Sequence, residues 1–526
     1  MSIMLSSIRK NSISIILSLF VSFCCVGNRC FLYPIDKQVC LKDVFLFILV
    51  CIAVFPILKW ILSINFTKYL YQENKCDRSS KSIILLGIFL FFLLSIVEIT
   101  YVVAFYPGCV SWDFQMELAQ ALGYEPIDYQ LNPLIMVLIR VIYIFKESVT
   151  ALIFVQCLVI NLIITSICVE AYQRGIKKKF LIIMVIIFML LPNNPLMLIT
   201  LSKDVTYACG FLGVLLVLVK WIVPSEKNSK NRYVLFLETA LCLALICYSR
   251  YNGILVAFCI IIALLVMFKS KRNLLTMILI CVFLVCIGLP LKNMAEVNNG
   301  QGTMYVGMTQ DMFGVYYAGG DLSSDAIDYL ESIVDLEAYR TEYTPYWTYW
   351  ESWTESFYTN NETKTIDFIK IYIDTFIRNP IKLMRCVLCR IDPIWDITKG
   401  IEGYETWIWK TKCSRYDFYP IMYPDHRDNA LSNVLNIYGE YSQRIPFRLV
   451  CWRNGLWFVI SLILLVRNIK YNKRIVLLWI PLISQIASMA AANGWSHYRY
   501  YWSIEVYVFW LIVAVISIKF QTEKVE

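Results

Sequence analysis

Residues Ser82–Phe105 read SIILLGIFLFFLLSIVEITYVVAF, and Glu98 is the only charged residue among them. A helix needs about 20 predominantly apolar residues to cross the hydrocarbon core of a bilayer. Inside that core the backbone must satisfy its own hydrogen bonds, which a helix does within a single segment. The stretch therefore predicts a transmembrane helix, and it makes lipid the solvent in which this part of the chain folds.

Runs of similar length and composition recur on both sides of this stretch. The chain has 526 residues, of which 59% are hydrophobic and 17% charged, and its mean hydropathy is +0.60. Soluble domains contain about 25% charged residues, so this composition excludes an ordinary soluble protein. We expect about twelve transmembrane helices. They centre on Ile13–Val26, Val44–Leu62, Ser82–Phe105, Val149–Val169, Phe180–Leu198, Val205–Val223, Tyr233–Tyr248, Ile254–Phe268, Leu274–Leu291, Leu449–Leu465, Ile475–Ala491 and Trp502–Ile518.

One hydrophilic block, roughly Lys292 to Pro446, interrupts the second half of the chain. We expect it to form a mixed, mainly helical domain outside the membrane, so the predicted fold class is an all-α polytopic membrane protein. Its aromatic residues, as in Tyr343–Trp353, can either stack on sugars or form a belt at the lipid interface. The predicted division is two spans with a basic loop at 1–81, a transmembrane module at 82–291, the extracytoplasmic domain at 292–446 and three spans at 447–526.

Basic residues lie in alternate loops between the predicted spans. Such loops are retained in the cytoplasm, which places a multi-pass protein in the cell membrane with both of its termini cytoplasmic. The net charge of +9 is explained by these loops, so it does not indicate a nucleic-acid partner. The basic set is Arg9, Lys10, Lys68, Lys75, Arg78, Lys81, Arg174, Lys177, Lys178, Lys179, Lys227, Lys230, Arg232, Lys269, Lys271, Arg272, Arg467, Lys470, Lys473 and Arg474.

This orientation requires that residues 106–148 do not cross the membrane. Leu134–Phe145 is apolar but too short to span comfortably, so we expect helices that lie on the outer surface. Ser111 is a suitable cap for the first of these helices, and Gly123 is a suitable terminator. Asp113 then falls in the first turn, where a carboxylate complements the helix dipole.

The outer loop that contains this first surface helix is acidic. From position 106 to position 131 it holds four acidic residues and no Lys or Arg. The acidic residues are Asp113, Glu117, Glu125 and Asp128. A carboxylate half-shielded by lipid and aromatic rings has its charged form disfavoured, which raises its pKa toward the range of a general base. We therefore expect a raised pKa at Asp113, in a patch that accepts protons or holds a cation.

Three cationic residues lie at the outer ends of predicted spans, against the usual charge bias. They are Lys203, Arg250 and Arg499. Each could be an anchor whose long side chain reaches the lipid interface. Together they also fit a pocket for an anionic head group at the membrane surface, for which phosphate is the natural candidate.

Five short motifs in these outer segments follow one another along the chain. They are Tyr106-Pro-Gly-Cys-Val-Ser-Trp-Asp113, Gln130-Leu-Asn-Pro-Leu134, Lys203-Asp204-Val205, Arg250-Tyr-Asn-Gly253 and Tyr498-Arg-Tyr500. The set resembles the GT-C superfamily of integral-membrane glycosyltransferases. The resemblance is to a bacterial branch related to the dolichyl-phosphate-mannose protein mannosyltransferases and the lipid A aminoarabinose transferases, and it covers the span pattern from about Ser82 onward.

The resemblance implies roles for particular residues. In the family an acidic residue of the module's first outer loop is the catalytic base or organises the acceptor, and Asp113 is similar to it. Asp204 looks like the acidic residue of the second loop, and the two would hold a divalent cation, Mg²⁺ or Mn²⁺, if one takes part. Relatives often have histidine where this chain has Asn132, which puts a histidine-dependent role there in doubt. The expected substrate-binding residues are Lys203, Arg250, Arg499, Glu117, Asn132 and His497.

The implied enzyme activity is transfer of a hexose or related sugar from a polyprenyl-phosphate donor to an extracytoplasmic acceptor, which is a cell-envelope glycan, lipid or protein. The leaving group is already an anion, so one carboxylate and a cationic clamp suffice, and a single displacement inverts the anomeric carbon.

Two other functions fit a chain of this kind. A transporter or flippase for lipid-linked sugars would place ionisable residues in mid-span. A polysaccharide polymerase or ligase would also use outer-face arginines.

Overall fold

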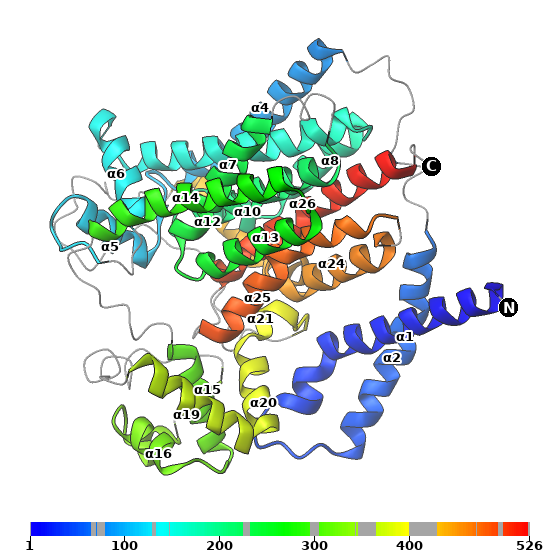
Figure 1. Ribbon diagram of the computed structural model, residues 1–526, viewed down its shortest axis with the longest axis vertical. Helices are drawn as coiled ribbons and strands as arrows, with labels where there is room; N and C mark the ends of the chain where they lie inside the picture. The colour runs from blue at the N-terminus through cyan, green and yellow to red at the C-terminus, as the bar shows by residue number, and fades with distance from the viewer. Residues whose placement is uncertain are drawn as a thin grey trace.

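The chain folds as a bundle of long helices with a smaller group of helices beside it (Figure 1). The computed structural model describes residues 2–64, 70, 79–128, 133–146, 148–224, 232–294, 305–341, 343–345, 364–398, 429–469, 471–492 and 498–523. Within these residues the backbone is helical almost throughout, and the only sheet has two strands of two residues each. The expectation of a helical protein is therefore confirmed.

The elements follow one another in a simple order along the chain. The first half contains α1 Ser2–Gly27, the π-helix η1 Asn28–Leu32, α2 Leu41–Ser63, α4 Ser80–Ala104, β1 Cys109–Val110, α5 Trp112–Ala121, α6 Pro133–Phe145, α7 Val149–Gln173, α8 Lys178–Leu190, α9 Asn193–Leu198, β2 Thr200–Leu201, α10 Lys203–Ile222 and α12 Arg232–Ser249. The second half contains α13 Gly253–Met267, α14 Lys271–Asn293, α15 Val306–Tyr317, α16 Ser324–Glu331, α17 Leu336–Tyr339, α19 Thr365–Arg378, α20 Pro380–Arg390, α21 Asp392–Trp395, α22 Ala430–Ser442, α23 Phe447–Cys451, α24 Asn454–Asn468, the 3₁₀-helix η7 Lys473–Trp479, α25 Ile480–Ala492 and α26 Tyr498–Glu523.

Eight helices of the described residues are long enough and apolar enough to cross a membrane, by length and composition alone. They are Ser12–Leu32, Leu41–Ser63, Ser80–Ala104, Val149–Gln173, Lys203–Ile222, Asn273–Asn293, Lys473–Ala491 and Tyr498–Ile518. Four further apolar helices are shorter. They are Leu134–Phe145, Tyr233–Ser249, Gly253–Met267 and Asn454–Asn468. A multi-pass membrane protein agrees with these helices, and the count of twelve spans stays a prediction.

The apolar run Phe180–Leu198 differs from its prediction, because it is not one continuous helix. α8 ends at Leu190, Leu191 is extended with φ −76° and ψ 109°, and the short helix α9 follows. A residue that precedes proline is disfavoured in the α region, and Leu191 precedes Pro192. The proline therefore accounts for the break.

Helices α10 and α26 form the centre of the bundle. Both are almost entirely buried, whereas α2 and α14 leave most of their apolar side chains exposed. α10 packs against α7, α12 and α26, and α26 also packs against α24. Apolar side chains on outer helices are favourable where lipid surrounds them, so the exposed faces of α2 and α14 fit contact with a bilayer.

The helix ends that carry the basic loops contact one another. Arg174 Nη2 donates a hydrogen bond to the carbonyl of Val223 over 2.8 Å, which joins the ends of α7 and α10. Arg467 Nη1 donates to the carbonyl of Ile61 over 3.1 Å, which joins the ends of α24 and α2. The basic end of α7 therefore lies beside the end of α10, and the basic end of α24 lies beside the end of α2.

Helices α15 to α20 form a group with its own core, which lies below the bundle in Figure 1. Phe313, Tyr329, Tyr339 and Phe368 are buried in that core. These aromatic side chains therefore stabilise the group rather than offer a surface to a sugar. A sugar-stacking role was one expectation for the aromatic run Tyr343–Trp353. Most of this run lies outside the described residues.

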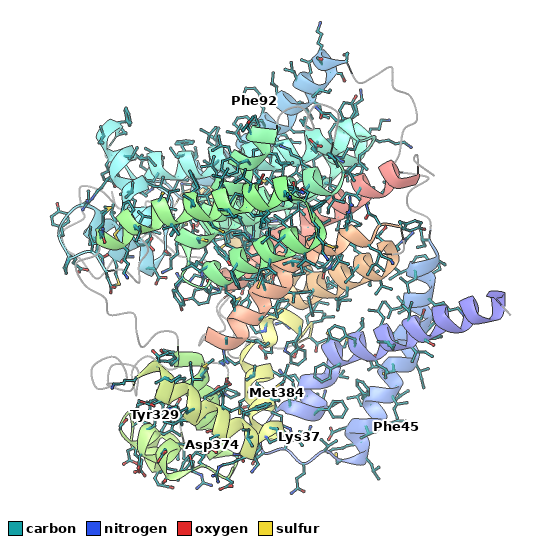
Figure 2. The ribbon with its side chains drawn as sticks, in the orientation of Figure 1. Lys37, Phe45, Phe92, Tyr329, Asp374 and Met384 are labelled. Atoms are coloured by element: carbon teal, nitrogen blue, oxygen red, sulfur yellow. The ribbon has the colours of Figure 1, made fainter. Side chains whose placement is uncertain are left out.

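The N-terminal hairpin of α1 and α2 contacts this group of helices. Arg385 Nη1 donates hydrogen bonds to the carbonyls of Ile35 and Lys37, each over 3.1 Å. Figure 2 shows Lys37 close to Met384, the neighbour of Arg385 on α20. Cys30 and Cys40 in the same hairpin are free thiols.

Candidate functional site

Two short strands bring the segment after α4 beside the segment after α9. Cys109 of β1 pairs in parallel with Thr200 of β2, and Val110 pairs with Leu201. Gln156 of α7 fixes the second of these segments, because its Nε2 donates to the carbonyls of Leu198 and Thr200 over 2.8 and 2.9 Å. The helices that follow the two strands therefore begin next to each other.

Each of these helices begins at a serine cap. Ser111 Oγ accepts a hydrogen bond from the backbone N–H of Phe114 over 3.2 Å, and α5 follows as the sequence predicts. Ser202 Oγ accepts from the backbone N–H of Asp204 over 3.2 Å, and α10 follows. Such caps satisfy N–H groups that the first turn leaves without an intrahelical partner. They place Asp113 and Asp204 in two neighbouring first turns.

Asp113 contacts two cations that come from distant parts of the chain. Its Oδ2 lies 3.2 Å from Lys203 Nζ, at the start of α10. The same oxygen lies 3.1 Å from Arg499 Nη2, at the start of α26. The side chain of Asp113 remains 22% exposed, so it is the carboxylate of this group that a ligand can reach.

Asp204 forms a second ion pair that shares Arg499 with the first. Its Oδ1 contacts Arg250 Nη1, and its Oδ2 lies 3.9 Å from Arg499 Nε. Ser202 Oγ donates to the same Oδ2 over 3.0 Å. Arg499 therefore connects the two carboxylates. We call the residues of this site the charged cluster: Asp113, Glu117, Lys203, Asp204, Arg250 and Arg499.

Tyr500 is a member of the site to which the sequence motifs gave no role. The guanidinium groups of Arg250 and Arg499 lie 4.5 and 4.7 Å from the centroid of its ring. Arg499 Nη2 also donates to the Tyr500 hydroxyl over 2.9 Å. Arginines that stack on an aromatic face are attracted to its electrons and held in a fixed orientation. Tyr500 thus keeps two cations side by side, and its position next to Arg499 in the motif was the available signal.

Glu117 lies one turn after Asp113 on α5, and its side chain is completely buried. Its nearest cation is Lys203 Nζ at 3.8 Å, and neither of its oxygens has a hydrogen-bond partner within the described residues. Burial raises the pKa of Glu117 to about 8, although the charge of Lys203 opposes the shift. Glu117 was expected to contact substrate. In this structure its part in the site is indirect, through Lys203.

The expectation of a raised pKa at Asp113 is wrong. Burial raises the pKa of this carboxyl, but the charges of Arg499 and Lys203 together outweigh burial and hold the pKa well below its usual range. The sequence suggested a carboxylate without a cationic neighbour, because the outer loop itself contains no Lys or Arg. The cations come from α10 and α26 instead.

The carboxylates of the cluster do not fit a divalent metal ion. Asp113 and Asp204 are each already ion-paired with cationic side chains. In the described part of the chain, no three or more His, Cys, Asp or Glu side chains come together in a manner that could hold a metal. The three cationic side chains of the cluster would also repel Mg²⁺ or Mn²⁺.

The structure brings together six of the eight residues that the sequence analysis assigned to the site. Asn132 and His497 lie outside the described residues. Two serines and a tyrosine, Ser111, Ser202 and Tyr500, complete the arrangement around the six. No family model, curated protein or solved structure matches this chain, so the charged cluster itself is the basis for a function.

Proposed function

We propose that this chain is a membrane glycosyltransferase that moves a sugar from a polyprenyl-phosphate donor to a hydroxyl of an extracytoplasmic acceptor. The observation that carries the proposal is the charged cluster itself. Charged residues from α5, α10, α26 and the turn between α12 and α13 meet at one end of a bundle of apolar helices. Burying so many charges is costly, and structures keep such groups mainly where they have a function.

The position of the cluster suits a lipid-linked substrate. It lies at the ends of α10 and α26, opposite the ends that carry the basic loops. Basic loops are retained in the cytoplasm, so the cluster would face the other compartment. A polyprenyl tail would lie among the apolar helices, and its phosphate would reach the level of Lys203, Arg250 and Arg499.

The residues then divide the chemistry between them. Asp113 takes the proton from the acceptor hydroxyl, whose oxygen forms a bond to the anomeric carbon. The bond between that carbon and the phosphate oxygen breaks, and its electron pair stays on the phosphate. Lys203, Arg250 and Arg499 stabilise the negative charge that develops there. Asp204 acts on the reaction through Arg250, whose guanidinium it orients.

One observation favours a transporter of lipid-linked sugars as a second candidate. Two buried carboxyl groups lie within helices that could cross a membrane. Glu98 of α4 accepts a hydrogen bond from Asn161 Nδ2 over 2.6 Å, and Glu505 of α26 accepts from Asn193 Nδ2 over 2.6 Å. Intramembrane carboxyls mark ion pathways in many transporters. Here each carboxyl group accepts a hydrogen bond from an asparagine side chain of a neighbouring helix. Such a bond would also serve to hold the two helices together.

The experiment that tests the proposal measures sugar transfer by the full-length chain in proteoliposomes. Radiolabelled polyprenyl-phosphate sugars are the donors, and membrane glycans, lipids and proteins are the acceptors. Asp113→Asn should lower transfer about 100-fold or more, because it removes the base. Glu125→Gln changes an acidic residue of the same outer loop that is not part of the charged cluster, and it should transfer at the wild-type rate.

Undiminished transfer by Asp113→Asn would remove Asp113 as the base. Passage of the lipid-linked sugar across the bilayer without transfer would favour the transporter instead. Activity only with a diphosphate-linked oligosaccharide would favour a polysaccharide polymerase or ligase.

A further inference from the structure

In the charged cluster, both cationic contacts of Asp113 fall on one oxygen. Lys203 Nζ and Arg499 Nη2 lie 3.2 and 3.1 Å from Asp113 Oδ2. Burial would raise the pKa of this carboxyl, but the two cations hold it well below its usual range. A carboxylate in this state is a weak proton acceptor. Asp113 therefore cannot be an efficient base while both contacts persist.

Both cations have alternatives to Asp113 within reach. Lys203 Nζ is 3.8 Å from Glu117 Oε1, and Arg499 Nε is 3.9 Å from Asp204 Oδ2. In addition, Arg499 Nη1 is buried and has no hydrogen-bond partner among the described residues. A buried donor without an acceptor costs free energy, which an added acceptor would recover. The site thus offers a guanidinium donor that Asp113 does not use.

The contacts of Arg250 are arranged differently. Arg250 pairs with Asp204, whose other oxygen accepts a hydrogen bond from Ser202 Oγ over 3.0 Å. The same guanidinium lies 4.5 Å from the ring centroid of Tyr500. Asp204 is the carboxylate that Arg250 contacts, whereas Lys203 and Arg499 each have a second carboxylate besides Asp113 within 4 Å.

We propose that an anionic phosphate exchanges with Asp113 as the partner of Lys203 and Arg499, and that this exchange frees Asp113 to act as the base. The inference rests on the proposed function and adds that the base is held inactive until the donor binds. The acceptor hydroxyl then gives its proton to Asp113 while its oxygen bonds to the anomeric carbon. The bond from that carbon to the phosphate oxygen breaks, and the added negative charge stays on the phosphate beside Lys203 and Arg499.

The test measures binding of a polyprenyl monophosphate to the full-length chain in lipid nanodiscs by tryptophan fluorescence. Asp113 competes with the phosphate for the same two cations, so Asp113→Asn should bind the lipid about tenfold more tightly than the wild type, although it loses transfer. Asp113→Glu keeps the competing charge and should bind like the wild type. Glu125→Gln removes a negative charge outside the cluster and should also bind like the wild type.

Two results would overturn the exchange in distinguishable ways. In the first, the wild type binds the lipid and transfers sugar, but Asp113→Asn binds the lipid equally or more weakly. This result would contradict the exchange and would not contradict the proposed function. A wild-type chain that neither binds polyprenyl monophosphate nor transfers sugar would end both. If the melting temperature shows that Asp113→Asn does not fold, Asp113→Ser removes the same charge and carries the same expectation.

Discussion

At the scale of single residues, Asp113 and Glu117 differ although both are carboxylic acids on one face of α5. Asp113 touches two cations at 3.1 and 3.2 Å, and its pKa is lowered against the effect of burial. Glu117 is fully buried, accepts no hydrogen bond from the described residues, and has only the more distant Lys203 at 3.8 Å, so burial prevails and its pKa is raised. The number and distance of the neighbouring cations therefore distinguish the two pKa values, and the charges of Asp113 and Asp204 raise the pKa of Glu117 further.

The raised pKa of Glu117 should make the stability of the chain depend on pH. The folded carboxyl keeps its proton up to about pH 8, whereas its ordinary pKa is 4.5. Between these values the folded state binds one proton more than the unfolded state, so stability falls as pH rises, by at most about 1.4 kcal/mol per pH unit. Glu117→Gln should remove this part of the dependence, which melting temperatures in detergent from pH 5 to pH 9 would reveal.

Glu125→Gln is the matched control for this measurement, because it changes the same functional groups in the same loop. Its melting temperature should follow the wild-type profile with pH. Parallel profiles for the wild type and Glu117→Gln would mean that Glu117 is already ionised in the folded protein at pH 5.

At the scale of elements, the pairing of β1 with β2 places α5 against α10. Gly108 precedes β1 with φ +120°, a backbone conformation that disfavours residues with a side chain. A Cβ at this position would also lie 1.9 Å from Ile153 Cδ1 on α7. Thr150 Oγ1 of α7 donates to the carbonyl of Pro107 over 3.0 Å, which holds the same turn. The turn before β1 thus needs both an unusual backbone angle and a close approach to α7.

Gly108→Ala should shift β1 away from α7 and separate Asp113 from Lys203. We expect a loss of sugar transfer of tenfold or more, about the effect of a misplacement near 1 Å, and a lower melting temperature. Gly123 is the matched control, since its φ is +82° but a Cβ there would meet nothing within 4 Å. Gly123→Ala should cost about 1–2 kcal/mol for the backbone angle alone and keep transfer. Equal transfer by the two variants would show that the approach to α7 does not position Asp113.

At the scale of the whole molecule, a buried ion pair joins the α15–α20 group to the bundle. Arg390 of α20 donates to both carboxylate oxygens of Asp311 on α15, over 2.9 and 2.6 Å. The same guanidinium donates to the carbonyls of Met489 and Ala490 at the end of α25, over 3.3 and 2.7 Å. α26, whose second residue is the cluster residue Arg499, is the next helix after α25. The group is therefore attached to the same end of the bundle as the charged cluster.

The orientation that we propose for the molecule predicts which positions an impermeant thiol reagent can reach on intact cells. Ser324 in the α15–α20 group and Lys269, between α13 and α14, are both exposed. Ser324→Cys should be labelled on intact cells, and Lys269→Cys only after the membrane is permeabilised, since basic loops are retained inside. Labelling of the wild type, which has its own cysteines, is the background to subtract. The opposite pattern would place the charged cluster in the cytoplasm.

The sequence determined the features that depend on local composition. Apolar runs such as Ser82–Phe105 became long helices, and Ser111 became a helix cap. Local chemistry suffices for these, because a helix and its cap are made within a few neighbouring residues. The residues of the site could also be chosen from the sequence, since charges at the outer ends of apolar runs are conspicuous.

Only the tertiary structure decided how those charges are paired. It showed that Asp113 lies between Lys203 and Arg499, that Glu117 is buried beside Lys203, and that Tyr500 stacks on two arginines. The interaction between charges depends on their separation in space, and these partners come from α5, α10 and α26, which are far apart along the chain. For the same reason the sequence-based prediction for the pKa of Asp113 had the wrong direction, because the cations that lower this pKa are absent from its own loop.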